Sequence, residues 1–178
     1  MSHPTTGGAD GPPAAYHLQP WCGPAAHQDV MHQETTARAV ILSDGFMLAL
    51  KPLYKAIFFT PGGRIEPSET TRAALAREMA EELPGVTFEV LAELGLIEHH
   101  WREPSGEDMI GRHHFFHVVA PALTPERAPA SVESGLTFAW LPIAGLGSLP
   151  IQPPSLARLV PQLASGQTYV WSAADFDA

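Results

Sequence analysis

The chain has 178 residues, 45% of them hydrophobic and 16% charged, and its formal net charge is −9. This length supports one well-buried domain, and the acidic balance argues against a protein that grips nucleic acid through clustered Lys and Arg. No apolar run approaches the length of a membrane span, and the N-terminus lacks the apolar stretch of a signal peptide. We therefore expect a cytoplasmic protein with no membrane segment and no nucleic-acid surface.

The first 29 residues are rich in Gly, Pro, Ala and His and show no sustained periodicity. We predict a flexible N-terminal arm over 1–29 and a single domain over 30–178. Trp21 could pin the arm to the domain or to a partner subunit, which leaves a homodimer open. Cys22 is the only cysteine, so no intramolecular disulfide can form, as is typical of intracellular proteins.

The domain begins with sequence patterns of β-strands. Two short apolar runs, at about 37–43 and 46–51, flank the pair Asp44-Gly45, which is typical of a type I′ hairpin turn. A third strand is expected at about 56–60. It leads directly into a segment with two consecutive glycines.

That segment, 61–63, predicts a loop, because glycine permits positive φ and lets the backbone approach a neighbour closely. A helix follows. Ser68 is a suitable N-cap, and Glu69 would lie in the first turn, where the helix dipole favours an anion. Strong helix formers occupy 72–83, and the Pro-Gly pair at 84–85 ends the helix.

Three carboxylates lie close together on this helix. At about 100° per residue, we place an apolar face opposite an acidic one. The apolar face comprises Leu75, Ala76, Met79 and Leu83, and the acidic face comprises Glu78, Glu81 and Glu82. Such a face could be a solvated surface on which Arg77 bridges to Glu81. It could instead supply oxygen ligands for Mg²⁺ or Mn²⁺.

The spacing of these residues favours the metal site. Gly63, Glu69 and the run 77–82 follow the pattern G-x5-E-x7-R-E-U-x-E-E, in which U is bulky and aliphatic. This run resembles the Nudix box of the Nudix hydrolases. It departs from the family pattern at its end, where Leu83-Pro84 precede Gly85, and we interpret the departure as a changed helix end.

The resemblance implies an α/β fold, the Nudix-like α/β/α sandwich with a mixed β-sheet between helices. It also implies an enzyme, a Nudix-type pyrophosphohydrolase that uses Mg²⁺, with Mn²⁺ as an alternative. The substrate would be a small-molecule diphosphate, namely a nucleotide sugar, a dinucleotide or a nucleoside triphosphate. A non-catalytic module that binds a nucleotide or a protein stays open as the alternative, although every carboxylate of the box is present.

The resemblance also implies roles for single residues. Glu78 and Glu82 would be the principal metal ligands, Glu81 an additional ligand or a group that orients a water, and Gly63 could offer its carbonyl. Arg77 would orient the carboxylates, and Glu69 would brace the loop against the helix. The general base could be Glu133, in the loop before Trp140, or Glu98, on the strand after the box, or a carboxylate of the box itself.

The remaining sequence predicts a hairpin with strands near 86–101 and 112–120, a proline-rich loop over 120–135 and a strand at 136–142. A helix is expected near 155–166, kinked or split at Pro161, and an edge strand after it. The hairpin carries five histidines, for which we weigh a zinc site, half-buried strand positions and contact with the substrate. They are His99, His100, His113, His114 and His117.

Overall fold

The computed structural model describes residues 32–167 and 170–176, and the predicted N-terminal arm with Trp21 and Cys22 lies outside them. The elements are β1 (His32–Ser43), β2 (Phe46–Pro52), β3 (Gly62–Arg64), α1 (Thr71–Glu82), β4 (Glu89–Arg102), β5 (Asp108–Val119), β6 (Leu136–Pro142), the 3-10 helix η1 (Ile143–Ser148), α2 (Leu156–Ala164) and β7 (Trp171–Phe176). None of the helices in these residues is long and apolar enough to cross a membrane.

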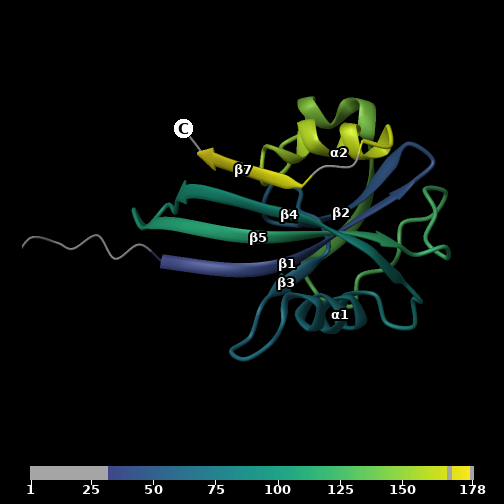
Figure 1. The fold of residues 1–178 in the computed structure, drawn as a ribbon, viewed down its shortest axis with the longest axis horizontal. Helices are drawn as coiled ribbons and strands as arrows, with labels where there is room; N and C mark the ends of the chain where they lie inside the picture. Colours follow the sequence, from purple (N-terminus) through teal and green to yellow (C-terminus); the bar gives the residue numbers. More distant parts are fainter. Residues whose placement is uncertain (1–31, 168–169, 177–178) are drawn as a thin grey trace, which may run out of the picture.

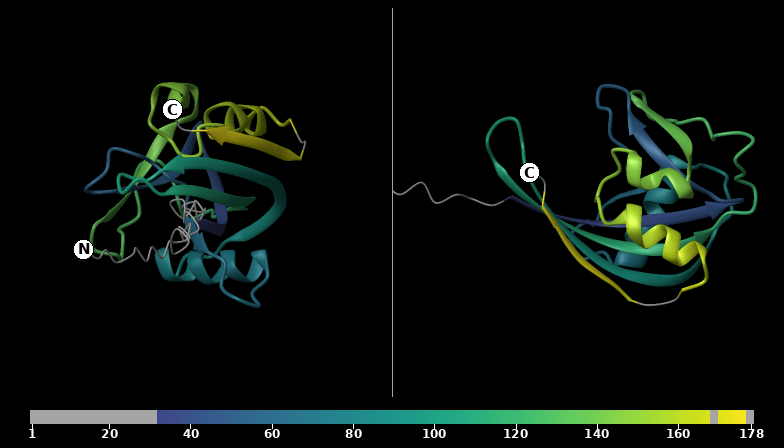
Figure 2. Two further views of the ribbon diagram at one scale, coloured as in Figure 1. Left: turned by 90° about the vertical axis from the view of Figure 1, so that its left-hand side faces the viewer. Right: turned by 90° about the horizontal axis from the view of Figure 1, so that it is seen from above.

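The strands form one mixed sheet in the order β6-β2-β1-β5-β4-β7, and β3 pairs with β1 beside this path. The pairs β1–β5 and β4–β7 are parallel, and the others are antiparallel. Helix α1 lies against one face of the sheet and α2 against the other (Figures 1 and 2). The predicted α/β sandwich with a mixed sheet between helices is therefore confirmed.

Two apolar clusters hold the layers together, one on each face of the sheet. The cluster under α1 includes Ala39 of β1 and Phe116 of β5, whereas the cluster under α2 includes their sequence neighbours Val40 and Phe115. Successive side chains of a strand point to opposite faces, so one strand supplies both clusters. The long central strand β1 is therefore covered on both sides.

Most predicted strands are confirmed, including the hairpin through Asp44 and Gly45, which have φ values of 47° and 81°. The third strand is wrong, because residues 56–60 form only isolated bridges. The glycines themselves form the strand: Gly62 pairs with Arg38, and a Cβ on Gly62 would lie 2.1 Å from the Ala37 carbonyl oxygen. Only a glycine allows this close approach.

The prediction of Ser68 as the helix N-cap is wrong. Helix α1 begins at Thr71, and its N-cap is Thr70, whose Oγ1 accepts a hydrogen bond from the Ala73 amide at 3.2 Å. Ser68 lies in the preceding turn with φ of 70°, and Glu69 lies before the helix as well. The sequence Ser-Glu-Thr-Thr offers several residues able to cap, and the Glu69 carboxylate accepts hydrogen bonds from the Glu66 amide and from the Arg77 side chain.

The predicted faces of α1 also need correction. Ala74 is buried in place of Ala76, and Glu82 is buried, with 7% of its surface exposed, rather than lying on the face opposite Leu75. Glu82 follows Leu75 by seven residues, which is about two turns of 3.6 residues, so both side chains leave the helix on nearly the same side. Helix α2 continues through Pro161, so the predicted split does not occur.

Candidate active site

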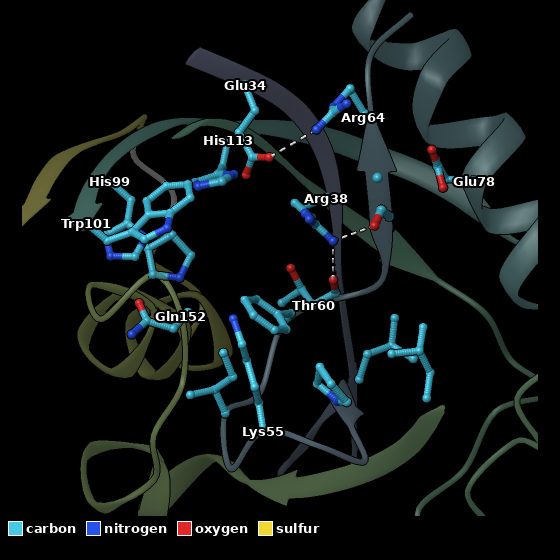
Figure 3. Close-up of a pocket in the computed structure, with 18 of the residues that line it drawn as sticks. Glu34, Arg38, Lys55, Thr60, Arg64, Glu78, His99, Trp101, His113 and Gln152 are labelled. Carbon is cyan, nitrogen blue, oxygen red and sulfur yellow. Dashed lines mark hydrogen bonds and ion pairs between the residues drawn. The ribbon is translucent and has the colours of Figure 1, made fainter. Parts of the chain in front are cut away.

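A cavity of about 680 Å³ opens beside β3, and residues of β1, β3, β4, β5 and α1 line it together with parts of the loops. Figure 3 shows Glu78 on one side of this cavity, Trp101 and His99 on the other, and Arg38 between them. The cavity therefore has a carboxylate end at α1 and an aromatic end at β4. Residues separated widely in the sequence meet here because β1, β5 and β4 are adjacent strands.

Glu82 is the most deeply placed carboxylate of the site. Its Oε2 accepts a hydrogen bond from the Gly62 amide at 2.8 Å. Burial raises the pKa of Glu82 to about 7, and the charges of Glu78 and Glu133 contribute to this increase. The hydrogen bond from the Gly62 amide and the charge of Arg38 lower the pKa but do not cancel the effect of burial. The positive charge near Glu82 in the folded protein is therefore too small to stabilise its ionised form fully.

Glu78 reaches the same cavity because Gly63 has no side chain. A Cβ on Gly63 would lie 2.3 Å from Glu78 Cδ, so the carboxylate packs directly against the backbone of β3. Glu78 also accepts a hydrogen bond from Arg77 Nη1 at 2.8 Å. The glycine pair thus brings β3 against the carboxylates of both Glu78 and Glu82.

Arg77 connects the helix to the segment before it. Its Nε and Nη2 donate to the two carboxylate oxygens of Glu69 at 3.1 and 3.0 Å, and its Nη2 also donates to the Arg64 carbonyl at 2.9 Å. The hydrogen bonds that Arg77 donates to Glu69 and Glu78 raise the pKa of Arg77, and the same bonds to Glu69 lower the pKa of that carboxylate. This network holds β3, the turn and the Glu78 carboxylate in one arrangement.

Arg38 was missed by the sequence reasoning. Its Nη1 donates to the carbonyls of Thr60, at 3.2 Å, and Gly62, and its Nε donates to Thr36 Oγ1 at 3.3 Å. Burial lowers the pKa of Arg38, and the nearby charges of Glu82, Glu34 and Glu78 offset only part of this effect. No carboxylate of the described residues lies within ion-pair distance of its guanidinium. A single cation inside the apolar run of 37–42 was the signal that could have revealed it.

The remaining carboxylates are placed differently from one another. Glu133 lines the cavity, in the loop where it was expected. The side chain of Glu81 is 57% exposed, 3.5 Å from Arg77 Nη1, and does not line the cavity. Glu98 also lies outside the cavity, where hydrogen bonds from His100 and Arg112 lower its pKa.

Two of the five histidines, His99 and His113, line the cavity, and the other three do not. Burial lowers the pKa of His113 to about 3, and its Nδ1 lies 2.8 Å from Thr36 Oγ1, so the ring is neutral. In residues 32–167 and 170–176, no three His, Cys, Asp or Glu side chains lie together as a metal site. The zinc alternative therefore finds no support among the described histidines.

The residues at the carboxylate end suit a hard divalent cation. Glu78 and Glu82 both line the cavity next to the Gly63 backbone, and they offer only oxygen. Two carboxylates are fewer than a complete set of ligands, but Mg²⁺ is commonly held by one or two carboxylates, with water and substrate phosphate completing its coordination. The raised pKa of Glu82 fits the same interpretation, since a nearby cation would stabilise the ionised form.

Comparisons with known proteins agree with this geometry. The family model described as NUDIX domain matches residues 33–163. Solved structures with a similar fold include two NUDIX hydrolases from Nitrosomonas europaea. The first is 22% identical with a TM-score of 0.52, and the match covers 78% of this chain and 93% of the solved chain. The second is 16% identical with a TM-score of 0.57, and the match covers 83% of this chain and 81% of the solved chain.

A UDP-X diphosphatase has the same fold, at 15% identity and a TM-score of 0.55, and covers 82% of this chain and 67% of that one. A search of the curated proteins found no significant match. At these identities the solved structures show a shared fold, whereas the family model shows membership.

Proposed function

The chain belongs to the Nudix family of hydrolases, and from this premise we propose that it cleaves the diphosphate linkage of a nucleoside diphosphate joined to another group, with the help of a divalent cation. The observation that carries this proposal is the buried carboxylate of Glu82, which lies in the cavity against the Gly62 amide. A buried carboxylate with a raised pKa is costly for a fold and typical of a functional site. The candidate substrates are nucleotide sugars, dinucleotides and nucleoside triphosphates.

Mg²⁺ or Mn²⁺ would be held by Glu78 and Glu82, with the carbonyl of Gly63 as a further ligand. When bound, such an ion neutralises phosphate charge and lowers the pKa of a coordinated water. Arg77 keeps Glu78 in place through its hydrogen bond, and Glu69 keeps Arg77 in place through two more. Groups that orient a ligand in this way are needed for metal affinity.

Arg38 supplies positive charge at the centre of the cavity. Its guanidinium has backbone carbonyls and a hydroxyl as hydrogen-bond acceptors but no paired carboxylate among the described residues. An anion entering the cavity would therefore gain a charge-assisted interaction. Lys55, in the loop after β2, adds a further cation to the lining, and so does Arg64, although Arg64 Nη2 lies 3.7 Å from Glu34 Oε2. We place the diphosphate of the substrate between these cations and the carboxylate end.

Glu133 is our candidate for the proton acceptor from the attacking water. It lines the cavity and lies close enough to Glu82 for its charge to raise the Glu82 pKa. Its position in a loop would let it approach the substrate when the loop closes. Glu133→Gln should then lower turnover strongly and leave substrate affinity nearly unchanged. Equal turnover of Glu133→Gln and the parent would transfer the role to a carboxylate of the box.

A substrate screen tests the proposed function directly. The parent is incubated with nucleotide sugars, dinucleotides and nucleoside triphosphates, with Mg²⁺, with Mn²⁺ and with chelator, and released phosphate, diphosphate and mononucleotide are measured. We expect cation-dependent release from one of these classes and none from Glu82→Gln. Binding of nucleotides without release by the parent would favour the non-catalytic module instead.

A further inference from the structure

The aromatic end of the cavity has a defined structure of its own. The rings of His99 and Trp101, two residues apart on β4, are stacked with centroids 5.1 Å apart and planes 29° apart. Trp101 Nε1 donates to Glu103 Oε1 at 2.8 Å, which fixes the orientation of the indole. His99 is 5% exposed, whereas Trp101 is half-buried and lines the cavity. The indole therefore offers a surface to a ligand while its other contacts hold it still.

The neighbouring strand leaves room for this wall at Gly111, which pairs with His99. A Cβ on Gly111 would lie 2.3 Å from His113 Nε2 and 3.0 Å from Trp101 Cζ3. The backbone at Gly111 has no left-handed φ, so the need for glycine here comes from the side chains around it. His113 beside this wall is neutral, and the charged neighbour Glu103 is occupied as the acceptor of the Trp101 N–H.

Gln152 adds a polar group to the same region. Figure 3 shows it on the same side of the cavity as Trp101. Its Oε1 is buried and accepts no hydrogen bond from any described residue. A buried acceptor without a donor is costly, so a ligand N–H at this oxygen would remove a penalty as well as add a contact. A side-chain amide can pair with both a donor and an acceptor on one edge of a heterocycle.

We propose that this wall is the base-recognition site of the enzyme: a nucleobase stacks on Trp101, and the amide of Gln152 hydrogen-bonds to the edge of the base. The inference rests on the proposed function only in placing the phosphates toward Arg38. A flat ring with N–H groups matches both features of the wall. An alkyl chain would leave Gln152 unsatisfied, and a base-free sugar phosphate has no π-face for Trp101. The cavity is within the size range of small-molecule sites.

Equilibrium binding to the metal-free full chain tests this proposal without any hydrolysis. Isothermal titration calorimetry is carried out with adenosine, guanosine, cytidine and uridine 5′-monophosphate and with ribose 5-phosphate. We expect the parent to bind at least one of the nucleotides more tightly than ribose 5-phosphate. Trp101→Ala should weaken nucleotide binding about tenfold, as loss of a base–aromatic stack does, and leave ribose 5-phosphate unchanged. Trp101→Phe should retain most of the preference.

Two further variants separate recognition from packing. Gln152→Leu should reduce the differences in dissociation constant between the four nucleotides, because the amide that distinguishes their base edges is gone. His100→Ala is the matched control, since it removes a ring from the same strand that stacks on Phe176 with centroids 4.5 Å apart and does not line the cavity. It should leave every dissociation constant as in the parent. Thermal unfolding of each variant shows that it is folded.

The proposal is overturned if the parent does not bind nucleotides more tightly than ribose 5-phosphate, or if Trp101→Ala weakens both ligands equally. Hydrolysis by the parent is measured in parallel. Absence of hydrolysis together with base-dependent binding would contradict the proposed function and support the base site. Hydrolysis without base-dependent binding would support the proposed function and contradict the base site.

Discussion

Helices α1 and α2 cover opposite faces of the same sheet, but they do so with different side chains. Helix α2 buries Leu156, Leu159 and Val160 and no charged group. Helix α1 buries Leu75 and Met79 and, with them, the carboxylate of Glu82. A helix can therefore hold a layer of the core and a buried carboxylate together, at the expense of stability. Helix α2 packs on the sheet in the same way but contributes no carboxylate to the cavity.

The largest effect on turnover is expected at Glu82, the buried carboxylate of α1. Glu82→Gln keeps the shape of the side chain and removes its charge, so the proposed cation would lose a ligand worth several kcal/mol of transition-state stabilisation. Turnover should fall about a thousandfold or more. Steady-state rates with Mg²⁺ measure this. The melting temperature of the parent should rise with metal and a substrate analogue, and that of Glu82→Gln should rise much less. Equal shifts would contradict the metal role.

A substitution in the core of α2 should lower stability and leave turnover unchanged. Leu156→Ala in α2 removes a fully buried side chain and leaves a cavity, so the free energy of unfolding should fall by about 2–5 kcal/mol. Denaturant titration measures the loss. Turnover per folded molecule should stay close to that of the parent, because α2 carries none of the proposed metal ligands. A large loss of turnover at temperatures where Leu156→Ala is folded would mean that α2 takes part in the chemistry.

The third prediction concerns pH and the metal-free protein. The pKa of Glu82 is about 7 in the folded state and near 4.5 when unfolded, so the folded state binds more protons between these values. Stability should therefore fall as pH rises through this window, by at most on the order of 3 kcal/mol, and level off above it. Glu82→Gln should remove this part of the pH dependence and be more stable than the parent at pH 8. Thermal unfolding from pH 4 to 8 tests both statements.

Each helix carries an arginine whose removal can be tested, Arg77 on α1 and Arg158 on α2. Arg77 orients Glu78 and Glu69, so Arg77→Ala should lower turnover about 10–100-fold, as the loss of other groups that orient metal ligands does. Arg158, exposed on α2, is the matched control, and Arg158→Ala should leave turnover unchanged. If both variants lose activity to the same degree, the orienting role of Arg77 is wrong.

The smallest effect is expected at Glu81, the exposed carboxylate of α1. Glu81→Gln removes repulsion toward Glu78 three residues before it and a weak contact with Arg77. These changes are each a few tenths of a kcal/mol, so the stability should change by about that amount. Turnover should fall less than in Glu78→Gln or Glu82→Gln. A loss as large as theirs would show that Glu81 reaches the reacting groups when substrate binds.

Several features of this site could be predicted from the sequence because their physical causes are local. The glycine pair and the spacing of Glu69, Arg77 and Glu78 identified the box, and the helix ends at its Pro-Gly stop. Period-two alternation predicted the β4–β5 hairpin and β6. The carboxylate at Glu133 was expected near the site from its loop alone, and the structure places it in the cavity.

The family, the order of strands and helices and the carboxylates of the box could be read from the chain, because turn residues, side-chain period and fixed spacing act within short stretches. That Arg38, Trp101 and Gln152 share a cavity with Glu82 follows from the three-dimensional fold alone. The fold also decides that Glu82 is buried, because burial depends on β3 pairing with β1 beneath the helix. Contacts between strands and loops that are far apart in the sequence produce no periodic pattern within any single segment, so they cannot be predicted from it.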